Sequence, residues 1–267
     1  MDDRQGDGAV LIRWEGVSKA FVKGGRPVQA LDSVTLEIPS GEFLAIVGPS
    51  GCGKSTLLNL TAGLMRPTGG SVLYGDAPVL GVNTGVGYIT QKDNLFPWRT
   101  VEDNIGLALE IRGVARAQRR ERVAKHIELV GLAGFEKHYP GELSGGMRKR
   151  VTLARTLIYE PETLLMDEPF GALDAQLKLI LHDELLRLWE STGKTIVFVT
   201  HDLAEAVSLA GRVAVFSGRP GRIKLIEEVK LPRPRDVFQV RFSAAFGAHF
   251  DRLWECLRED LRRGEEV

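Results

Sequence analysis

The sequence is poor in cysteine, and this limits the compartment in which the chain works. There are two cysteines among 267 residues, and one of them, Cys52, lies within a glycine-rich segment. Two cysteines cannot form the disulfide framework that small secreted domains use. The chain therefore suits a reducing compartment. Its length is sufficient for one large α/β domain, or for one domain with an insertion.

An excess of charge of either sign is also missing. The 35 lysine and arginine residues are balanced by 35 aspartate and glutamate residues. Domains that hold nucleic acid by its phosphates usually carry a surplus of basic residues. We therefore predict that no nucleic acid is a partner.

Long apolar runs are absent as well. The longest, such as Phe43–Val47 and Ile196–Val199, fall far short of the roughly 20 residues that a membrane-spanning helix needs. Met1-Asp2-Asp3 is acidic and is not followed by the apolar segment of a signal peptide. Residues 1–8 are expected to be a frayed end. A role at a membrane would therefore depend on a partner protein.

The most specific feature that is present is the segment Gly48–Thr56, here called the phosphate loop. It fits G-x-x-x-x-G-K-[ST], after a short apolar run and before a helical pattern. In such a loop, backbone N–H groups cradle phosphates at a helix N-terminus. The lysine reaches the β- and γ-phosphates and the hydroxyl group holds magnesium. A glycine-rich turn without a ligand is the alternative, which the full match disfavours. The predicted phosphate-binding residues are Gly48, Pro49, Ser50, Gly51, Cys52, Gly53, Lys54, Ser55 and Thr56, with Cys52 interpreted as a small residue and not as a reactive thiol.

Strand-like and helix-like segments alternate along the chain, which predicts a mostly parallel sheet covered on both faces. Residues 100–158 differ, because three helix-length apolar patterns follow one another there and predict a helical insertion. Phe21 is expected in a turn rich in lysine and glycine. The expected strands are Val10–Ser18, Val34–Ile38, Phe43–Val47, Ser71–Tyr74, Val86–Thr90, Thr163–Met166, Thr195–Thr200, Arg212–Ser217 and Arg222–Val229. The expected helices are Val101–Ile111, Arg116–Val130, Gly146–Tyr159 and Gln176–Glu190, with a largely helical tail over Val237–Glu265.

Ionisable residues follow two of the expected buried strands. Asp167 and Glu168 come directly after one, and His201 follows another. Beside a phosphate loop, Asp167 would hold magnesium and Glu168 would orient or deprotonate a water molecule. His201 would hydrogen-bond a γ-phosphate. The alternatives are that the carboxylates cap the next turn and that the histidine has no function.

Leu143-Ser144-Gly145-Gly146-Met147 precedes a helical pattern and offers a second set of exposed N–H groups. The phosphate loop already provides the chain's own phosphate cradle. This segment is therefore either a simple helix cap or a contact to the nucleotide of another molecule.

Taken together, these motifs resemble those of the ATPase subunits of ABC transporters. The phosphate loop, Gln91, Leu143–Met147, Leu164–Pro169, Gly171–Asp174 and His201 occur in that family's order and spacing, and the resemblance covers about residues 10–230. It implies an α/β fold with a P-loop NTPase (RecA-like) core, an antiparallel β part and an inserted helical subdomain. The implied ATPase domain is 1–230, with its core at about 10–91 and 160–230 and its helical subdomain at about 92–159. Residues 231–267 would form a mostly helical extension.

The resemblance also implies a homodimer that binds ATP and Mg²⁺ between two head-to-tail subunits. Phe21 would stack on adenine, Leu143–Met147 would contact the opposite ATP through Ser144, Gly145 and Gly146, and Asp174 would cross the interface. The implied catalytic residues are Glu168, His201 and Lys54. The implied metal-binding residues are Ser55, Gln91 and Asp167.

Further segments resemble the ATPases of nitrate, sulfonate and taurine importers, namely Asn94–Ile105, Arg219–Ile223 and Leu231–Arg235. This implies a peripheral location on the cytoplasmic face of the cell membrane, with transmembrane permease subunits as partners and a solute-binding protein as an indirect one. Phe96 and Trp98 would lie beside the permease contact, although Trp98 could instead pack in the local core. The implied solute is a small anionic nutrient.

Some features leave alternatives open. Lys149 stands where the family most often has glutamine, and the basic run around it is expected to face the dimer or the core. Arg116–Arg122 is expected to be a solvated face, with anionic lipid as the alternative. The rival functions are the ATPase of an exporter, a soluble ABC ATPase acting on nucleic acid or ribosomes, and a P-loop kinase. A kinase would need neither Leu143–Met147 nor Asp174.

Overall fold

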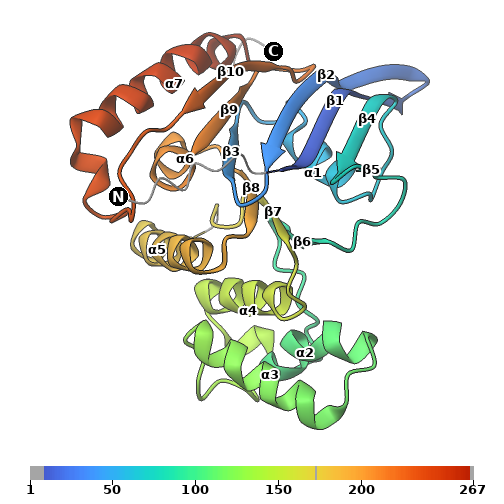
Figure 1. Cartoon of the computed structure of the whole chain (residues 1–267), viewed down its shortest axis with the longest axis vertical. Helices are drawn as coiled ribbons and strands as arrows, with labels where there is room; N and C mark the ends of the chain where they lie inside the picture. The colour runs from blue at the N-terminus through green and yellow to red at the C-terminus, as the bar shows by residue number, and fades with distance from the viewer. Residues whose placement is uncertain (1–8, 172, 265–267) are drawn as a thin grey trace.

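The computed structural model describes residues 9–171 and 173–264. The expected frayed end and Ala172 of the Gly171–Asp174 motif lie outside the described residues. Figure 1 shows a large lobe that contains the sheets and a smaller helical lobe that contains α2, α3 and α4. The strands are β1 (Val10–Lys23), β2 (Arg26–Pro39), β3 (Phe43–Val47), β4 (Gly69–Tyr74), β5 (Ala77–Pro78), β6 (Val86–Ile89), β7 (Thr163–Asp167), β8 (Thr195–Val199), β9 (Arg212–Phe216) and β10 (Ile223–Glu228). The helices are α1 (Lys54–Thr61), α2 (Val101–Ile111), α3 (Arg116–Leu129), α4 (Gly145–Leu157), α5 (Ala175–Thr192), α6 (Leu203–Leu209) and α7 (Ala244–Gly264), with short 3-10 turns at Pro140–Glu142 and Val240–Phe242.

The central sheet has six strands in the order β10-β9-β3-β8-β7-β6. All its pairings are parallel except that of β9 with β10. Every residue of β3, β7 and β8 is buried, as expected for strands covered on both faces. Because parallel strands end at the same edge of a sheet, the segments that follow β3, β6, β7 and β8 meet there. The predicted α/β fold class is confirmed.

A second sheet is antiparallel, with the order β2-β1-β4-β5. Along the end of β2, residues 34–38 alternate between buried and exposed, as their sequence pattern predicts. The sheet packs over α1, where the indole N–H of Trp14 donates a hydrogen bond of 3.0 Å to Thr61 Oγ1. The predicted antiparallel part is thus present, and one of its faces covers the helix that follows the phosphate loop.

The expected turn position of Phe21 is wrong. Strand β1 continues to Lys23, and Phe21 pairs with Val28 of β2. The turn is confined to Gly24 and Gly25, whose positive φ angles of 57° and 76° suit glycine. Two residues are sufficient to reverse the chain in a hairpin, so the lysine-rich residues before them remain in the strand.

The helical lobe is built around the apolar faces of α2, α3 and α4, which share one buried cluster. Ile105, Val123 and Val151 are among its members. Arg116, Arg120 and Glu121 of α3 are exposed, in agreement with the expected solvated face. Asn104 is fully buried, and its Nδ2 atom donates hydrogen bonds to the backbone oxygens of Phe96, Arg99 and Thr100. This amide fixes the segment that leads into α2.

The C-terminal extension packs against the large lobe through α7. Phe246, Leu253 and Leu257 join the main buried cluster. The helix begins at Ala244, later than the expected Val237, because residues 236–243 form a turn and the 3-10 segment. Arg235 is buried and donates to the backbone oxygens of Val207, Ser208, Ala210 and Val229, which include the C-terminal end of α6. Helix C-terminal carbonyls favour a cation.

None of the helices in the described ranges has the length and apolar character needed to cross a lipid bilayer.

A buried carboxylate supports the segment at the end of β8. Glu205 of α6 is 3% exposed, and its Oε2 accepts a hydrogen bond of 2.6 Å from Thr200 Oγ1. Its Oε1 lies 3.4 Å from Lys178 Nζ and 3.5 Å from His182 Nε2. Burial alone raises the pKa of Glu205, but His182, Thr200 and Lys178 together lower it to about 2. Its ionised form therefore stabilises the fold.

We predict that Glu205→Gln lowers the free energy of unfolding at pH 7 by about 3 kcal/mol, because it removes one charge of a buried ionic group. In the wild type, this contribution is present above the ordinary carboxyl pKa of 4.5 and is lost as the pH falls towards 2. Urea unfolding at a series of pH values measures it. Glu228→Gln is the control, because Glu228 is exposed in its pair with Lys230. An unchanged acid dependence in Glu205→Gln would contradict the prediction.

Candidate functional site

The phosphate loop connects the end of β3 to the start of α1 and depends on its glycines. Gly53 caps α1 with a φ of 103°. A Cβ atom at Gly53 would lie 2.7 Å from Leu31 Cδ2, and one at Gly48 would lie 2.9 Å from the backbone oxygen of Phe216. Both positions therefore exclude a side chain, and Gly53 also has a backbone conformation that L-residues rarely adopt. The loop is held close to β2 and β9 as a result.

Lys54 and Cys52 both lie on the inner side of the loop. Lys54 is buried, and its Nζ donates hydrogen bonds of 2.8 Å and 2.9 Å to the backbone oxygens of Gly48 and Pro49. Cys52 is 1% exposed, and burial raises the pKa of its thiol. A buried neutral thiol is a poor nucleophile, so the interpretation of Cys52 as a small packing residue agrees with its environment.

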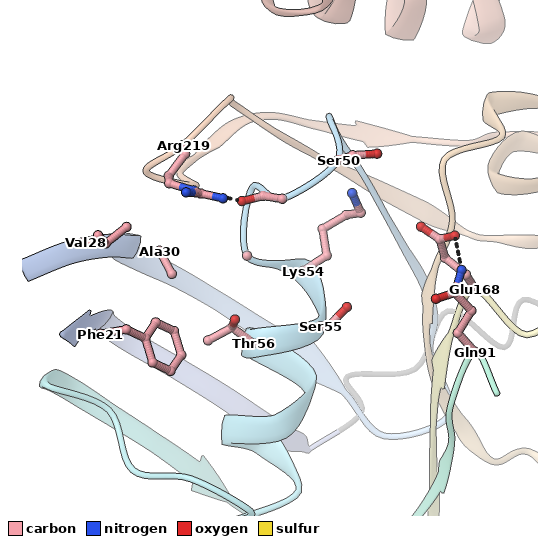
Figure 2. Close-up of a pocket in the computed structure, with 12 residues that line it drawn as sticks. Phe21, Val28, Ala30, Ser50, Lys54, Ser55, Thr56, Gln91, Glu168 and Arg219 are labelled. Carbon is pink, nitrogen blue, oxygen red and sulfur yellow. Dashed lines mark hydrogen bonds between the residues drawn. The ribbon is translucent and has the colours of Figure 1, made fainter. Parts of the chain in front are cut away.

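A cavity of about 510 Å³ lies along the loop, a size that suits a small ligand. Figure 2 shows Phe21, Val28 and Ala30 on one side of the loop and Gln91 and Glu168 on the other. Its full lining is Phe21, Val28, Ala30, Ser50, Gly51, Gly53, Lys54, Ser55, Thr56, Gln91, Glu168 and Arg219. Phe21 is 41% exposed, and its side chain is available to a planar partner. The cavity thus has an aromatic end, a loop of N–H groups and a polar end.

Three lining residues were missed by the sequence analysis, namely Val28, Ala30 and Arg219. Val28 could have been found, because it pairs with Phe21 across the hairpin, but only if the strand had been extended past Ser18. Ala30 has no distinctive sequence signal. Arg219 was noticed within a family-like segment, yet nothing in the sequence places that segment beside the phosphate loop.

Asp167 and Ser55 form the part of the site that could hold a divalent cation. Ser55 donates a hydrogen bond to the Asp167 carboxylate. Burial raises the pKa of Asp167, the Ser55 hydrogen bond opposes the rise, and the neighbouring Glu168 charge adds to it. The hydroxyl and the carboxylate are hard oxygen donors, which Mg²⁺ prefers. The residues present therefore fit a magnesium ion.

Glu168 receives two polar side chains at one oxygen. His201 Nδ1 lies 3.1 Å from Glu168 Oε2, and Gln91 Nε2 lies 3.4 Å from the same atom. The Glu168 backbone has a positive φ of 45°, and its N–H still donates to Val199 of β8 at 2.9 Å. A non-glycine residue in this conformation is strained. Three residues that follow β6, β7 and β8 thus converge on one carboxylate, at the polar end of the cavity.

The other predicted contacts lie away from the cavity lining. Ser144 caps α4 and accepts a hydrogen bond from Met147 N at 3.3 Å, and Asp174 caps α5 by accepting one from Leu177 N at 2.9 Å. The lining of the cavity includes neither Asp174 nor any residue of Leu143–Met147. Gly146 packs so closely on α5 that a Cβ atom there would lie 2.2 Å from Leu177 Cδ2. The Leu143–Met147 segment and the start of α5 are therefore neighbours within one chain.

The residues after this segment face the chain's own interior. Lys149 is 8% exposed; its Nζ donates to the backbone oxygen of Gln91 at 2.6 Å and lies 2.8 Å from Asp93 Oδ1. Arg148 pairs with the other oxygen of Asp93 at 3.2 Å. Thr152 and Arg155 donate to the backbone oxygen of Asp93. Helix α4 therefore holds the segment after Gln91 in place. Lys149 was expected to face either the dimer or the core, and it faces the core.

We predict that Lys149→Met lowers the free energy of unfolding by about 2 kcal/mol, because Asp93 loses a buried charge partner but keeps Arg148. Lys149→Gln should lose less, since its amide can still donate to Gln91. Lys125→Met is the matched control, because Lys125 forms an exposed pair with Glu121 on α3, and such pairs contribute under about 0.5 kcal/mol. Urea unfolding measures all three. Equal effects of Lys149→Met and Lys125→Met would contradict the prediction.

Comparisons with known proteins give a consistent assignment. The family model described as "ABC transporter" matches residues 31–171. An uncharacterized ABC transporter ATP-binding protein of Methanocaldococcus jannaschii is 49% identical over 233 residues, which are 87% of this chain and 87% of that protein. An aliphatic sulfonates import ATP-binding protein of Bacillus licheniformis is 47% identical over 217 residues, which are 81% of this chain and 84% of that protein.

Among solved structures, a dimeric ATP-binding cassette in a post-hydrolysis state, bound to ADP and Pi, is similar with a TM-score of 0.75. It is 31% identical, and the match covers 83% of this chain and all of that one. With the phosphate loop, the convergent carboxylate and the helical lobe, these matches show that the chain belongs to the ABC transporter family, as one of its ATP-binding proteins.

Proposed function

We propose that this chain is the ATP-hydrolysing subunit of an ABC importer for a small anionic nutrient. The observation that carries the proposal is the cavity along the phosphate loop. It has an aromatic ring at one end, and at the other the carboxylate on which His201 and Gln91 converge. A purine nucleotide with its phosphate chain has the same order of parts.

ATP binding follows from the lining. The N–H groups of the phosphate loop and of the first turn of α1 would hold the phosphates. Lys54 now donates to two loop carbonyls, and a phosphate is a stronger acceptor for the same ammonium group. The exposed Phe21 ring would stack on the adenine, with Val28 beside it in the next strand.

Magnesium would be held by Ser55 and Asp167, with Gln91 as a third oxygen donor from the polar end. When bound, the ion would neutralise charge that develops on the phosphates during transfer. Asp167 must be ionised for this role. Because burial raises its pKa, the site favours binding of a cation that restores the charged form.

Glu168 is the proposed general base. Its carboxylate lines the cavity beyond the end of the phosphate loop, where it would accept a proton from a water molecule that attacks the γ-phosphorus. His201 Nδ1 contacts the Glu168 oxygen that Gln91 also contacts, and would hold the carboxylate in place. The imidazole would also hydrogen-bond the γ-phosphate. Thr200, the residue before His201, donates a buried hydrogen bond to Glu205, which supports a fixed backbone position for His201.

The proposed active unit is a homodimer. Ser144, Gly145 and Gly146 lie outside the chain's own cavity, and the Ser144 end of α4 presents N–H groups that could serve a second copy's nucleotide. Asp174 is also exposed, as a residue at a subunit interface would be in one isolated chain. The dimeric state of the similar cassette supports this arrangement.

Permease subunits are the proposed membrane partners, with a solute-binding protein acting through them on the cytoplasmic assembly. Trp98 is 70% exposed and touches Phe96 edge-on at 5.4 Å between ring centroids. The alternative in which Trp98 packs in the local core is therefore wrong. An exposed tryptophan packed on a half-buried phenylalanine, beside the Gln91 segment, suits a protein contact. The name of the Bacillus licheniformis relative supports a sulfonate as the solute, with nitrate and taurine as related anions.

Hydrolysis and dimerisation can be tested together. We predict that Glu168→Gln retains ATP binding, hydrolyses ATP about 10²–10⁴-fold more slowly, and dimerises when ATP is added. Size-exclusion chromatography with and without ATP measures the dimer. Adding Ser144→Arg to Glu168→Gln should abolish ATP-dependent dimerisation while single-subunit ATP binding remains. Unchanged turnover in Glu168→Gln would exclude its role as base, and a P-loop kinase would show no ATP-dependent dimer.

The solute can be tested in the source organism. We predict that a deletion strain fails to grow on aliphatic sulfonates as the only sulfur source, while growth on sulfate is normal, because ATP hydrolysis drives uptake of the anion. The wild-type gene should restore growth and Glu168→Gln should not. Normal growth of the deletion strain on sulfonates, taurine and nitrate would contradict the proposed solute class and leave an exporter as the alternative.

A further inference from the structure

The loop 217–222 connects β9 to β10. It is far from the phosphate loop in the sequence but lies beside it in the large lobe. Gly221 N–H donates to the backbone oxygen of Ala30 at 2.9 Å, and Asp32 N–H donates to the backbone oxygen of Gly221 at 3.0 Å. These bonds join the loop to β2, on the strand whose Val28 and Ala30 line the cavity. The loop is therefore a fixed part of the cavity wall.

The same loop lies against the phosphate loop. A Cβ atom at Gly221 would lie 2.0 Å from the backbone oxygen of Cys52, so only glycine fits at that position. Hydrogen bonds from Ser217 Oγ to the backbone oxygens of Gly218 and Pro220 hold the turn together. The position of the residue between them, Arg219, is therefore set by contacts on both of its sides.

Arg219 reaches over the phosphate loop. Its Nε donates a hydrogen bond of 3.2 Å to the backbone oxygen of Gly51, and its Nη2 lies 3.1 Å from the place that a Cβ of Gly51 would take. Figure 2 shows the guanidinium between Val28 and Ala30 on one side and Ser50 on the other. It lines the cavity at the rim that joins the aromatic end to the phosphate loop.

The charge of Arg219 has no carboxylate partner among the ion pairs of the described residues, which makes it different from its neighbour. Arg222, three positions along, pairs with Asp32 and does not line the cavity. A guanidinium has five N–H donors, and Arg219 uses one of them on Gly51. Arg219 lines the cavity that the proposed function fills with a phosphate chain, and guanidinium groups bind phosphate through paired, charge-assisted hydrogen bonds.

We propose that Arg219 is a nucleotide-binding residue that donates to phosphate oxygens of the bound nucleotide from the rim of the phosphate loop. The proposal rests on the proposed ATP-binding function and extends it by a second cation. Lys54 would bind the phosphates from inside the phosphate loop, whereas Arg219 would bind them from its outer rim, next to Phe21. The ligand class is therefore a nucleoside diphosphate or triphosphate.

A structural role for Arg219 is the competing explanation, because its hydrogen bond to Gly51 could simply hold the phosphate loop in shape. Arg219→Gln separates the two roles, since it removes the charge and keeps an amide that can donate to a backbone oxygen. Arg222→Gln is the matched control on the same loop, because it removes an equal charge that is already paired with Asp32.

Isothermal titration with MgADP provides the test, because ADP binds one subunit without hydrolysis. We expect Arg219→Gln to weaken MgADP binding about tenfold, which is the loss of one charged hydrogen bond. Arg222→Gln should stay within about twofold of the wild type. The Arg219→Gln defect should shrink as the salt concentration rises from about 0.05 M to 0.5 M, because salt screens an exposed charge.

Two results would overturn the proposal. One is MgADP affinity in Arg219→Gln within about twofold of the wild type. The other is a loss of affinity that is independent of salt and accompanied by a lower melting temperature without nucleotide, which would assign Arg219 a structural role. Failure of the wild-type protein to bind MgADP would refute the proposed function, and with it this inference.

Discussion

Burial of the central parallel strands is the constraint on which the site depends. All residues of β3, β7 and β8 are buried, so an ionisable group in the middle of these strands would lose its hydration without a partner. Polar chemistry is therefore confined to the C-terminal ends of the strands, such as Asp167 at the end of β7, and to the residues that follow them. Since these strands run in the same direction, the phosphate loop, the Asp167–Glu168 pair and His201 must meet at one edge. The apolar composition of the strands and their shared direction therefore determine where the site lies, whichever motifs occupy it.

This explains why so much could be predicted from the sequence. Apolar runs that end in a glycine loop, in two carboxylates or in a histidine identify the edge without knowledge of strand order. What could not be predicted depends on contacts between distant segments. The lysine and glycine residues around Phe21 predict a turn there, because composition does not give the register of the hairpin, in which Phe21 pairs with Val28. Arg219 reaches the cavity through backbone bonds between its loop and β2, which no periodicity reports. The direction of Lys149 depends on which face of α4 meets the segment after Gln91.

The two lobes share the polar end of the cavity. The phosphate loop is held by β2, β3 and β9 in the large lobe, whereas the segment after Gln91 is held by four side chains of α4 in the helical lobe, namely Arg148, Lys149, Thr152 and Arg155. Gln91 itself contacts Glu168, which belongs to the large lobe. Helix α4 and the segment after Gln91 are joined by several hydrogen bonds and ion pairs. The contact of Gln91 Nε2 with Glu168 Oε2, at 3.4 Å, is longer than that of His201 Nδ1 with the same oxygen, at 3.1 Å.

The two glycines of the Leu143–Met147 segment differ in how closely the rest of the chain packs against them. Gly146 faces α5 so closely that an added Cβ would lie 2.2 Å from Leu177 Cδ2, so a side chain there would require Leu177 to move. At Gly145, the nearest atom to an added Cβ would be Leu173 Cδ2 at 3.6 Å, which is an ordinary contact. Packing does not require glycine at that position, and its φ is not positive. Close approach of the backbone to the nucleotide of a second copy, as proposed above, would be a reason for glycine there. Gly145 and the capping hydroxyl of Ser144 are therefore the residues of this segment that we propose for contact with the nucleotide of a second copy, whereas Gly146 also has a packing reason within the chain.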